Sequence, residues 1–255
     1  MLRAFIKRRF LSRGVWFQRK SGVLLENWQD ELRIDLTFLV GHLLQRRDPL
    51  TFVQVGAYDG VANDPLSDFI RRGKLRGVLV EPQPDAFVSL RQNYQGISGL
   101  AFENCAIGDA VGRSPFYRVK EQFEPLVQRS RQMSGFSSEV LLKHYRAVLA
   151  DPTTAIETIE VPTVTLTHLL EKHGLETLDL LQIDAEGHDY AVLKAVDFSK
   201  VRPAIIGYET ANLSRDDRDR SYALLLGHGY LIYEAGHDCL AYHRSVRESA
   251  PGALL

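Results

Sequence analysis

The sequence is short of cysteine, of unbalanced charge and of long apolar runs, and each shortage excludes a class of protein. Its two cysteines, Cys105 and Cys239, lie far apart with no C-x-x-C or Cys/His spacing, so neither a disulfide framework nor a zinc site is expected. The net charge of -1 gives no bias toward nucleic acid. No apolar run is long enough to span a bilayer, and no signal-peptide pattern is visible. A cytoplasmic protein is therefore expected.

Length and composition are typical of one globular domain. A chain of 255 residues with 45% hydrophobic and 25% charged residues can build a full α/β core but not two ordinary domains plus a linker. We expect a basic and helical extension over residues 1–48, packed on a domain that covers residues 49–255. In residues 24–44 the spacing predicts a helix, with one face formed by Leu32, Leu36, Leu39, Val40 and Leu43.

Residues 1–20 contain no acidic side chain. Seven Lys or Arg residues alternate there with Phe, Ile, Leu and Trp, a pattern typical of a basic amphipathic helix on an anionic membrane surface. A basic helix that docks on the domain or on a second subunit is an equal alternative. Peripheral contact with the inner membrane surface through residues 1–20 is carried as a weak hypothesis.

The segment FVQVGAYDG, residues 52–60, predicts a buried parallel strand that delivers a nucleotide-like ligand to a glycine loop. Gly56 and Gly60 suit positions where the backbone turns or approaches a ligand closely. The loop lacks the third glycine of the G-x-G-x-x-G pattern that seats a pyrophosphate. Asp59 favours a positively charged ligand such as an ammonium or sulfonium group, and S-adenosylmethionine carries both.

A second predicted strand, residues 77–82, ends in Glu81. An acid at the tip of the second strand of a nucleotide-binding βαβ unit accepts hydrogen bonds from ribose hydroxyls, so Glu81 is the predicted ribose ligand. The alternative is a surface glutamate that caps the helix beginning at Pro84.

The middle of the chain departs from the strand–helix alternation. Residues 100–107 predict a third strand and its loop, and residues 114–119 and 156–161 predict a hairpin-like pair. The insertion between them, residues 120–155, is expected to cover the substrate, because insertions at the carboxyl edge of such a sheet lie above the ligand crevice. Within it, Ser137 or Ser138 is expected to begin a helix. The alternative is a plain surface insertion.

The densest ionisable cluster, DAEGHD, follows a predicted buried strand and begins at Asp184. Glu186 and His188 lie within it. A further strand, residues 203–209, ends in Glu209, and its tip is expected beside Asp184 because consecutive parallel strands usually neighbour each other. The alternative is that Asp184 and Glu186 merely cap the next helix.

Four motifs in order, VQVGAYDG, VLVEPQP, ENCAIGD and LDLLQIDAEGHDYAVLKAV, resemble the FkbM-type family of S-adenosylmethionine-dependent methyltransferases over residues 51–233. The resemblance implies an α/β, Rossmann-like class I methyltransferase fold, with a seven-stranded, mostly parallel sheet of order 3-2-1-4-5-7-6 and helices on both faces. Gln54 stands where the family usually has Asp, so Asp59 or another acid is expected at the ammonium group. The cofactor contacts that follow are Gln54, Gly56, Tyr58, Asp59, Gly60, Glu81, Pro82, Asn104, Ala106 and Asp184.

The resemblance also places the Asp184 motif beside the methyl-transfer centre and implies methylation of a hydroxyl on a sugar, glycan or secondary metabolite. The predicted catalytic residues are Asp184, His188, Glu186 and Glu209. In the favoured mechanism His188 or Asp184 takes the hydroxyl proton. In the less favoured one Asp184 and Glu209 hold a divalent ion such as Mg²⁺. An NAD-type oxidoreductase and a non-catalytic S-adenosylmethionine-binding protein remain as alternatives, and no nucleic-acid partner is expected.

Overall fold

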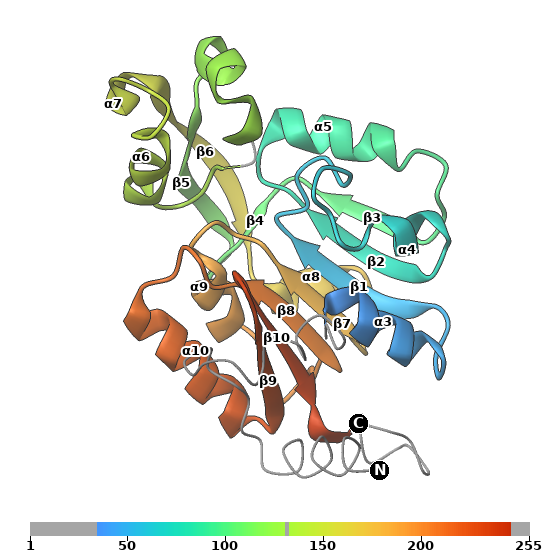
Figure 1. The fold of residues 1–255 in the computed structure, drawn as a ribbon. Helices are drawn as coiled ribbons and strands as arrows, with labels where there is room; N and C mark the ends of the chain where they lie inside the picture. Colours follow the sequence, from blue (N-terminus) through green and yellow to red (C-terminus); the bar gives the residue numbers. More distant parts are fainter. Residues whose placement is uncertain (1–34, 131–132, 246–255) are drawn as a thin grey trace, which may run out of the picture.

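A computed structural model describes residues 35–130 and 133–245 of the chain. A seven-stranded sheet of order β3-β2-β1-β7-β8-β10-β9 forms its centre (Figure 1). Its strands are β1 Leu50–Val55, β2 Leu75–Val80, β3 Leu100–Glu103, β7 Leu180–Ile183, β8 Ile205–Glu209, β9 Tyr230–Ala235 and β10 Asp238–His243. β10 pairs antiparallel with β8 and β9, and the other pairs are parallel.

The labels differ from the predicted order 3-2-1-4-5-7-6 because three strands between β3 and β7 belong to a separate sheet. Counted along the chain within the large sheet alone, its strands follow the sequence 3-2-1-4-5-7-6. The prediction of a mostly parallel seven-stranded sheet is therefore confirmed.

Helices cover both faces of the large sheet, and each face has its own apolar core. Alternate residues of β1 point to opposite sides, so Val53 and Val55 join one cluster while Leu50 and Phe52 join the other. The first cluster contains residues of α8 Leu166–Lys172, α9 Asp189–Lys194 and α10 Arg215–Gly227. The second contains residues of α3 Leu36–Leu44, α4 Ser67–Arg71 and α5 Pro84–Asn93.

Side-chain caps fix where several helices begin. The side chains of Thr165, Ser137 and Ser214 accept a backbone N–H three residues later, at the starts of α8, α6 (Ser138–Tyr145) and α10. The cap at Ser137 matches one of the two predicted positions. Such caps fix the direction in which each helix leaves its strand or loop.

Two helix predictions need correction. Of the helix predicted over residues 24–44, α3 covers only Leu36–Leu44, and residues 24–34, including Leu32, lie outside the described part. The pair Asp64-Pro65 predicts a helix with Asp64 at its cap, but α4 begins at Ser67 with Leu66 as its N-cap. The Asp64 carboxylate instead accepts the backbone N–H of Leu66 in the loop before it.

A second, three-stranded sheet of order β4-β6-β5 carries the predicted insertion. Its strands are β4 Ala106–Ile107, β5 Gly112–Val119 and β6 Ile156–Val164, of which β5 and β6 pair antiparallel as predicted. Between them lie the 3-10 segment η1 Glu121–Ser130 and the helices α6 Ser138–Tyr145 and α7 Pro152–Ala155. This unit projects from the carboxyl edge of the large sheet (Figure 1).

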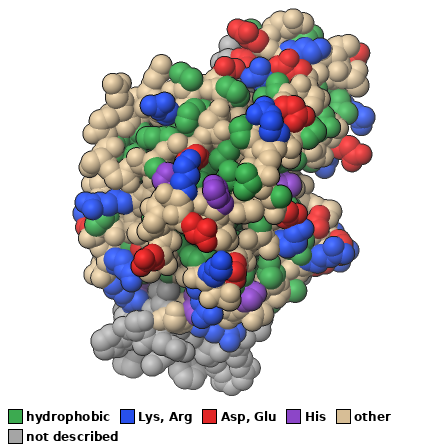
Figure 2. Space-filling view, turned by 180° about the vertical axis from the view of Figure 1, so that it is seen from behind, with side chains coloured by type: hydrophobic (Ala, Val, Ile, Leu, Met, Phe, Trp, Pro, Cys, Tyr) green, Lys and Arg blue, Asp and Glu red, His purple; other side chains and the backbone are tan. Residues whose placement is uncertain are grey.

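The surface mixes charges of both signs. Lys and Arg alternate with Asp and Glu over the face in Figure 2, which fits the net charge of -1. None of the helices within the described residues is long and apolar enough to cross a membrane.

Candidate active site

A pocket opens at the carboxyl ends of β1, β2 and β7. This is the place where the sheet order reverses, since the chain builds outward from β1 to β3 and then returns beside β1 with β7. The predicted residues that line the pocket are Gln54, Gly56, Tyr58, Glu81, Pro82, Ala106, Asp184, Glu186 and His188. Asp59, Gly60, Asn104 and Glu209 lie behind this lining.

The first loop is shaped by its contacts with the protein itself. Gly56 has a positive φ of 78°, and a Cβ there would lie 1.8 Å from the carbonyl oxygen of Asp184. Gly60, with φ of 73°, packs against Tyr94 in the same way. The Asp59 carboxylate accepts the N–H groups of Val61 and Ala62 at 2.9 and 2.8 Å. Gly60 and Asp59 therefore hold the turn rather than line the pocket, whereas Gly56 both shapes the turn and lines the pocket.

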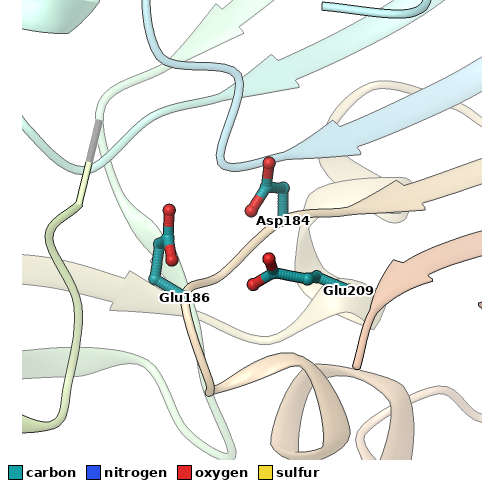
Figure 3. A group of neighbouring side chains, drawn as sticks. All are labelled: Asp184, Glu186 and Glu209. Atoms are coloured by element: carbon teal, nitrogen blue, oxygen red, sulfur yellow. The ribbon is translucent and has the colours of Figure 1, made fainter. Parts of the chain in front are cut away.

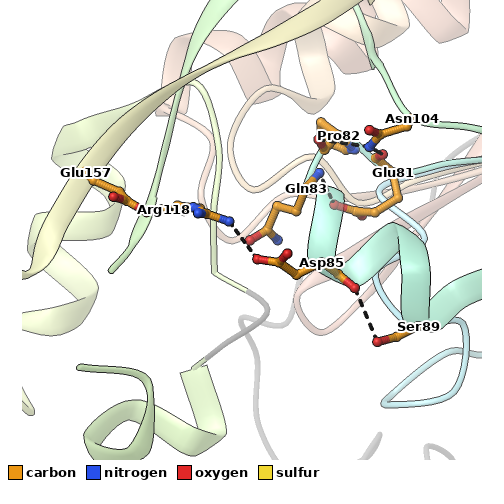
Figure 4. Close-up of polar contacts among 8 residues, drawn as sticks. All are labelled: Glu81, Pro82, Gln83, Asp85, Ser89, Asn104, Arg118 and Glu157. Carbon is orange, nitrogen blue, oxygen red and sulfur yellow. Dashed lines mark hydrogen bonds and ion pairs between the residues drawn. The ribbon is translucent and has the colours of Figure 1, made fainter. Parts of the chain in front are cut away.

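Glu81 is the best-anchored polar side chain of the pocket. It is 3% exposed, and its two carboxylate oxygens accept the N–H groups of Tyr58 and Gln83, each at 2.8 Å. It caps no helix, because α5 has Gln83 as its N-cap, so the alternative of a surface cap is wrong. The Asn104 amide donates to the carbonyl oxygens of Glu81 and Pro82, which fixes the end of β2 (Figure 4).

The second sheet and its insertion, residues 106–164 and called the cover unit below, also border the pocket. Phe116 of β5 and the segment Ser134–Phe136 line it together with Ala106. Tyr117 and Gly135 exchange two backbone hydrogen bonds, so the segment runs beside β5. At the outer edge Arg118 donates to Glu157 and to Asp85 at the start of α5 (Figure 4). Arg118 therefore ties the second sheet to the start of α5, beside the pocket.

Three carboxyl groups lie together at the ends of β7 and β8, and those of Asp184 and Glu186 line the pocket. Asp184 follows β7, Glu186 lies two residues later with a positive φ of 49°, and Glu209 ends the neighbouring strand β8 (Figure 3). One oxygen of each lies within 4.8 Å of the others. The Asn212 amide donates to Glu186 and Glu209 at 2.9 and 3.0 Å and so bridges them. Asp184 and Glu209 are adjacent, as expected from their strands.

Asp189, the first residue of α9, fixes the loop that follows β7. It is fully buried and accepts the N–H groups of Ala185, Gly187 and Glu209 at 3.1–3.3 Å. Asp184 and Glu186 accept no N–H from α9 within the described residues. Because Asp189 stabilises this loop, the carboxylates of Asp184 and Glu186 are left facing the pocket.

Burial and mutual repulsion make these acids hard to ionise. Burial, with the carboxylates of Glu209, Asp238 and Asp64, raises the pKa of Asp184 to about 7, although its side chain is open to the pocket. Burial, followed by Asp184 and Glu209, raises the pKa of Glu186 to about 9. Burial also raises the pKa of Glu81 to about 7.

His188 adds no charge to the pocket at pH 7, and two acidic or polar lining residues were not predicted from the sequence. Burial lowers the pKa of His188 below 6.5, so the imidazole is neutral at pH 7. Asp64 and Gln182 line the pocket but were not predicted for it. The pair Asp64-Pro65 is typical of a helix start, so the sequence did not indicate a pocket residue there. Gln182 lies inside an apolar strand, where no pocket residue was expected. None of the described lining side chains is Lys or Arg.

The fold and pocket define a class I methyltransferase-like α/β protein, with its ligand pocket at the switch point of the sheet. A family model described as the methyltransferase FkbM domain matches residues 54–232, and the chain belongs to this family.

A solved structure of low sequence identity has the same fold. The methyltransferase FkbM from Methylobacillus flagellatus KT matches with a TM-score of 0.52 and 16% identity, over 85% of this chain and 50% of that one. The chain thus spans about half the length of that protein. A methyltransferase from Geobacter sulfurreducens matches with a TM-score of 0.41 and 13% identity, over 92% and 94% of the two chains. A search of curated proteins gave no match.

Proposed function

We propose that this chain is an S-adenosylmethionine-dependent O-methyltransferase for a hydroxyl on a sugar, glycan or secondary metabolite. The observation that carries the proposal is the pocket, which combines a buried Glu81 at the end of β2 with the Asp184–His188 segment at the end of β7 and has no described cationic side chain in its lining. The acceptor class rests on the family alone.

The pocket lining suits this cofactor, which offers hydrogen-bond donors and positive charge. Glu81 would accept the ribose hydroxyls through the lone pairs that its two backbone donors leave unused. Two amide oxygens of lining residues, Oε1 of Gln54 and of Gln182, are buried and have no hydrogen-bond partner among the described residues. Asp64, which takes a hydrogen bond from Gln54, would supply the carboxylate expected opposite the ammonium group.

The same lining disfavours an NAD-type oxidoreductase. A pyrophosphate needs a glycine-rich cradle or cations, and the Cβ position of Gly56 is filled by the Asp184 carbonyl, not left open for a phosphate. No Lys or Arg among the described lining residues would balance the phosphate charge. Carboxylates in their place would repel it.

The proposed reaction requires that the methyl donor and the acceptor are held in position and that the acceptor hydroxyl loses its proton. S-adenosylmethionine supplies the electrophilic methyl group, and positioning accounts for most of the acceleration. The neutral His188 imidazole would accept the proton of the acceptor hydroxyl at Nδ1 or Nε2, while the methyl group would leave the cofactor sulfur for that oxygen and S-adenosylhomocysteine would remain. Glu186, protonated at pH 7, and Glu209 would orient the acceptor by hydrogen bonds.

A divalent cation is the second candidate mechanism, favoured by the distances among the three carboxyl groups. Asp184, Glu186 and Glu209 would supply oxygen atoms to an ion such as Mg²⁺, which would lower the pKa of the hydroxyl. Turnover in EDTA followed by addition of Mg²⁺ or Mn²⁺ separates the mechanisms. Loss and recovery of activity favour the ion, whereas full activity in EDTA leaves base catalysis by His188.

Calorimetric titration of the full chain with S-adenosylhomocysteine, S-adenosylmethionine and NAD tests the cofactor. Binding of the first two without NAD supports the proposal, and binding of NAD alone overturns it. Transfer of labelled methyl from S-adenosylmethionine to a panel of glycosides and small alcohols then tests the enzyme. Cofactor binding with no transfer to any hydroxyl would favour the non-catalytic alternative.

A further inference from the structure

His188 lies at the pocket, and within residues 35–130 and 133–245 no hydrogen bond orients its ring. Among the described residues neither ring nitrogen has a protein partner, whereas a histidine that acts as a base is usually fixed by a hydrogen bond to its second nitrogen. A neutral imidazole that is free to rotate presents either nitrogen to the pocket. The chain therefore needs another contact to hold this ring.

That contact comes from the segment Ser134–Phe136 of the cover unit, called the cover segment below. The rings of Phe136 and His188 lie 4.4 Å apart between centroids, tilted by 37°, which is a close contact at the short end of the separations typical of packed aromatic rings. Phe136 itself is held by the edge-to-face contact with the buried ring of Phe116, at 5.3 Å and 89°. Two successive ring contacts thus connect β5 with His188.

The backbone next to Phe136 is fixed as well. Gly135 exchanges two hydrogen bonds with Tyr117 of β5, and a Cβ on Gly135 would lie 3.3 Å from the carbonyl oxygen of Glu186. In α6, Val140 approaches Gly187 in a similar way. Because glycines allow this close approach on both sides, the cover segment and the loop from Ala185 to His188 form one packed unit.

We propose that Phe136 is a positioning residue that fixes the His188 imidazole in the pocket by ring packing. The insertion thus completes the catalytic site as well as covering it. The importance of this position for turnover rests on the proposed function, whereas the ring contact itself does not.

The ring contact is tested by NMR of the full chain, with the His188 ring signals identified by comparison with His188→Gln. We expect a nuclear Overhauser contact between the Phe136 and His188 rings in the unsubstituted chain. Phe136→Leu should move the His188 ring-proton shifts, because the aromatic ring current is lost, and Phe136→Tyr should leave them near their original values. Phe123→Leu, an equal change elsewhere in the insertion, should not move them.

Absence of that contact in the unsubstituted chain overturns the proposal, whether or not Phe136→Leu folds. With a hydroxyl acceptor found in the transfer assay, Phe136→Leu should lower kcat about tenfold with a smaller change in KM, and Phe136→Tyr should restore it. An unchanged kcat in Phe136→Leu also overturns it while leaving methyl transfer intact. Failure of the proposed function would appear differently, as a lack of transfer by every variant.

Discussion

At the scale of single residues, Glu81 is a buried carboxylate that two backbone N–H groups hold at the end of β2. Its pocket location fits the prediction from an acid at the tip of a second strand, and its two backbone hydrogen bonds explain how a carboxylate stays ordered there. Glu81→Gln should weaken S-adenosylhomocysteine by about tenfold, because one charge-assisted acceptor is lost while the shape is kept. Calorimetry measures this. Glu103→Gln, on the next strand and paired with Lys172 outside the pocket lining, is the matched control and should bind normally.

Asp184 tests the other side of the pocket. Asp184→Asn removes a carboxylate that faces the pocket and contacts the acidic cluster, so kcat should fall by about 10²-fold or more with little loss of cofactor affinity. Steady-state kinetics and calorimetry on the same preparation separate the two effects. Near-normal kcat in both Asp184→Asn and His188→Ala would mean that the catalytic centre lies elsewhere in the pocket.

The residues that the sequence did not reveal share a physical reason. Asp64 precedes a proline and has the pattern of a helix cap, yet the helix begins three residues later and its carboxylate turns toward the pocket. Phe136 lies in an insertion without periodicity, and only its tertiary contact with His188 gives it significance. Local patterns predict positions on an element, whereas these roles depend on contacts between distant segments.

At the scale of elements, the link between the cover unit and α5 is the feature that sequence patterns could not predict. Arg118 joins Asp85, one residue inside α5, to Glu157 on β6, with N–O distances of 2.9 and 2.8 Å. The Asp85 side chain is largely exposed, so each pair contributes less than about 1 kcal/mol to stability. The larger effect of the Arg118 link is expected on the position of the cover unit relative to the Glu81–Gln83 segment.

Arg118→Gln should therefore lower Tm by only about 2–4 °C while it weakens S-adenosylhomocysteine about threefold or more. The reason is that the cofactor side of the pocket and the cover unit would no longer be joined at this edge. Thermal unfolding and calorimetry give the two numbers. Arg113→Gln, on the same strand with a contact only to the Glu160 carbonyl, is the control. Equal binding losses in both variants would contradict a specific link.

At the scale of the whole molecule, the buried acids connect the site with stability. Glu186 has a pKa of about 9 in the folded chain against an ordinary value of 4.5, and Asp184 and Glu81 are raised to about 7. Between the ordinary and the raised values the folded chain holds more protons than the unfolded chain. The free energy of unfolding therefore falls as pH rises from about 4.5 to about 9. The lowered pKa of His188 acts in the opposite sense, below about 6.5.

Thermal unfolding should show this fall directly. Tm of the unsubstituted chain should drop by about 5 °C between pH 6.5 and pH 8.5, and Glu186→Gln should reduce the drop. Glu121→Gln, at an exposed position, is the control, and its Tm should change with pH as the Tm of the unsubstituted chain does. A Tm that is flat or rising over this range would mean that the carboxyl groups ionise without penalty in the folded chain.

The last prediction concerns residues 1–20, which lie outside the described part of the chain. Their seven cations and lack of acids would attract an anionic bilayer by about 1 kcal/mol for each residue near the surface, a force that salt screens within a Debye length of about 10 Å at 0.1 M. The full chain should sediment with phosphatidylserine vesicles at low salt and be released at high salt. Deletion of residues 1–20 should abolish sedimentation and leave S-adenosylhomocysteine binding intact. If the full chain ignores these vesicles at low salt, the membrane hypothesis is wrong, and if the deleted chain misfolds, the segment instead docks on the domain.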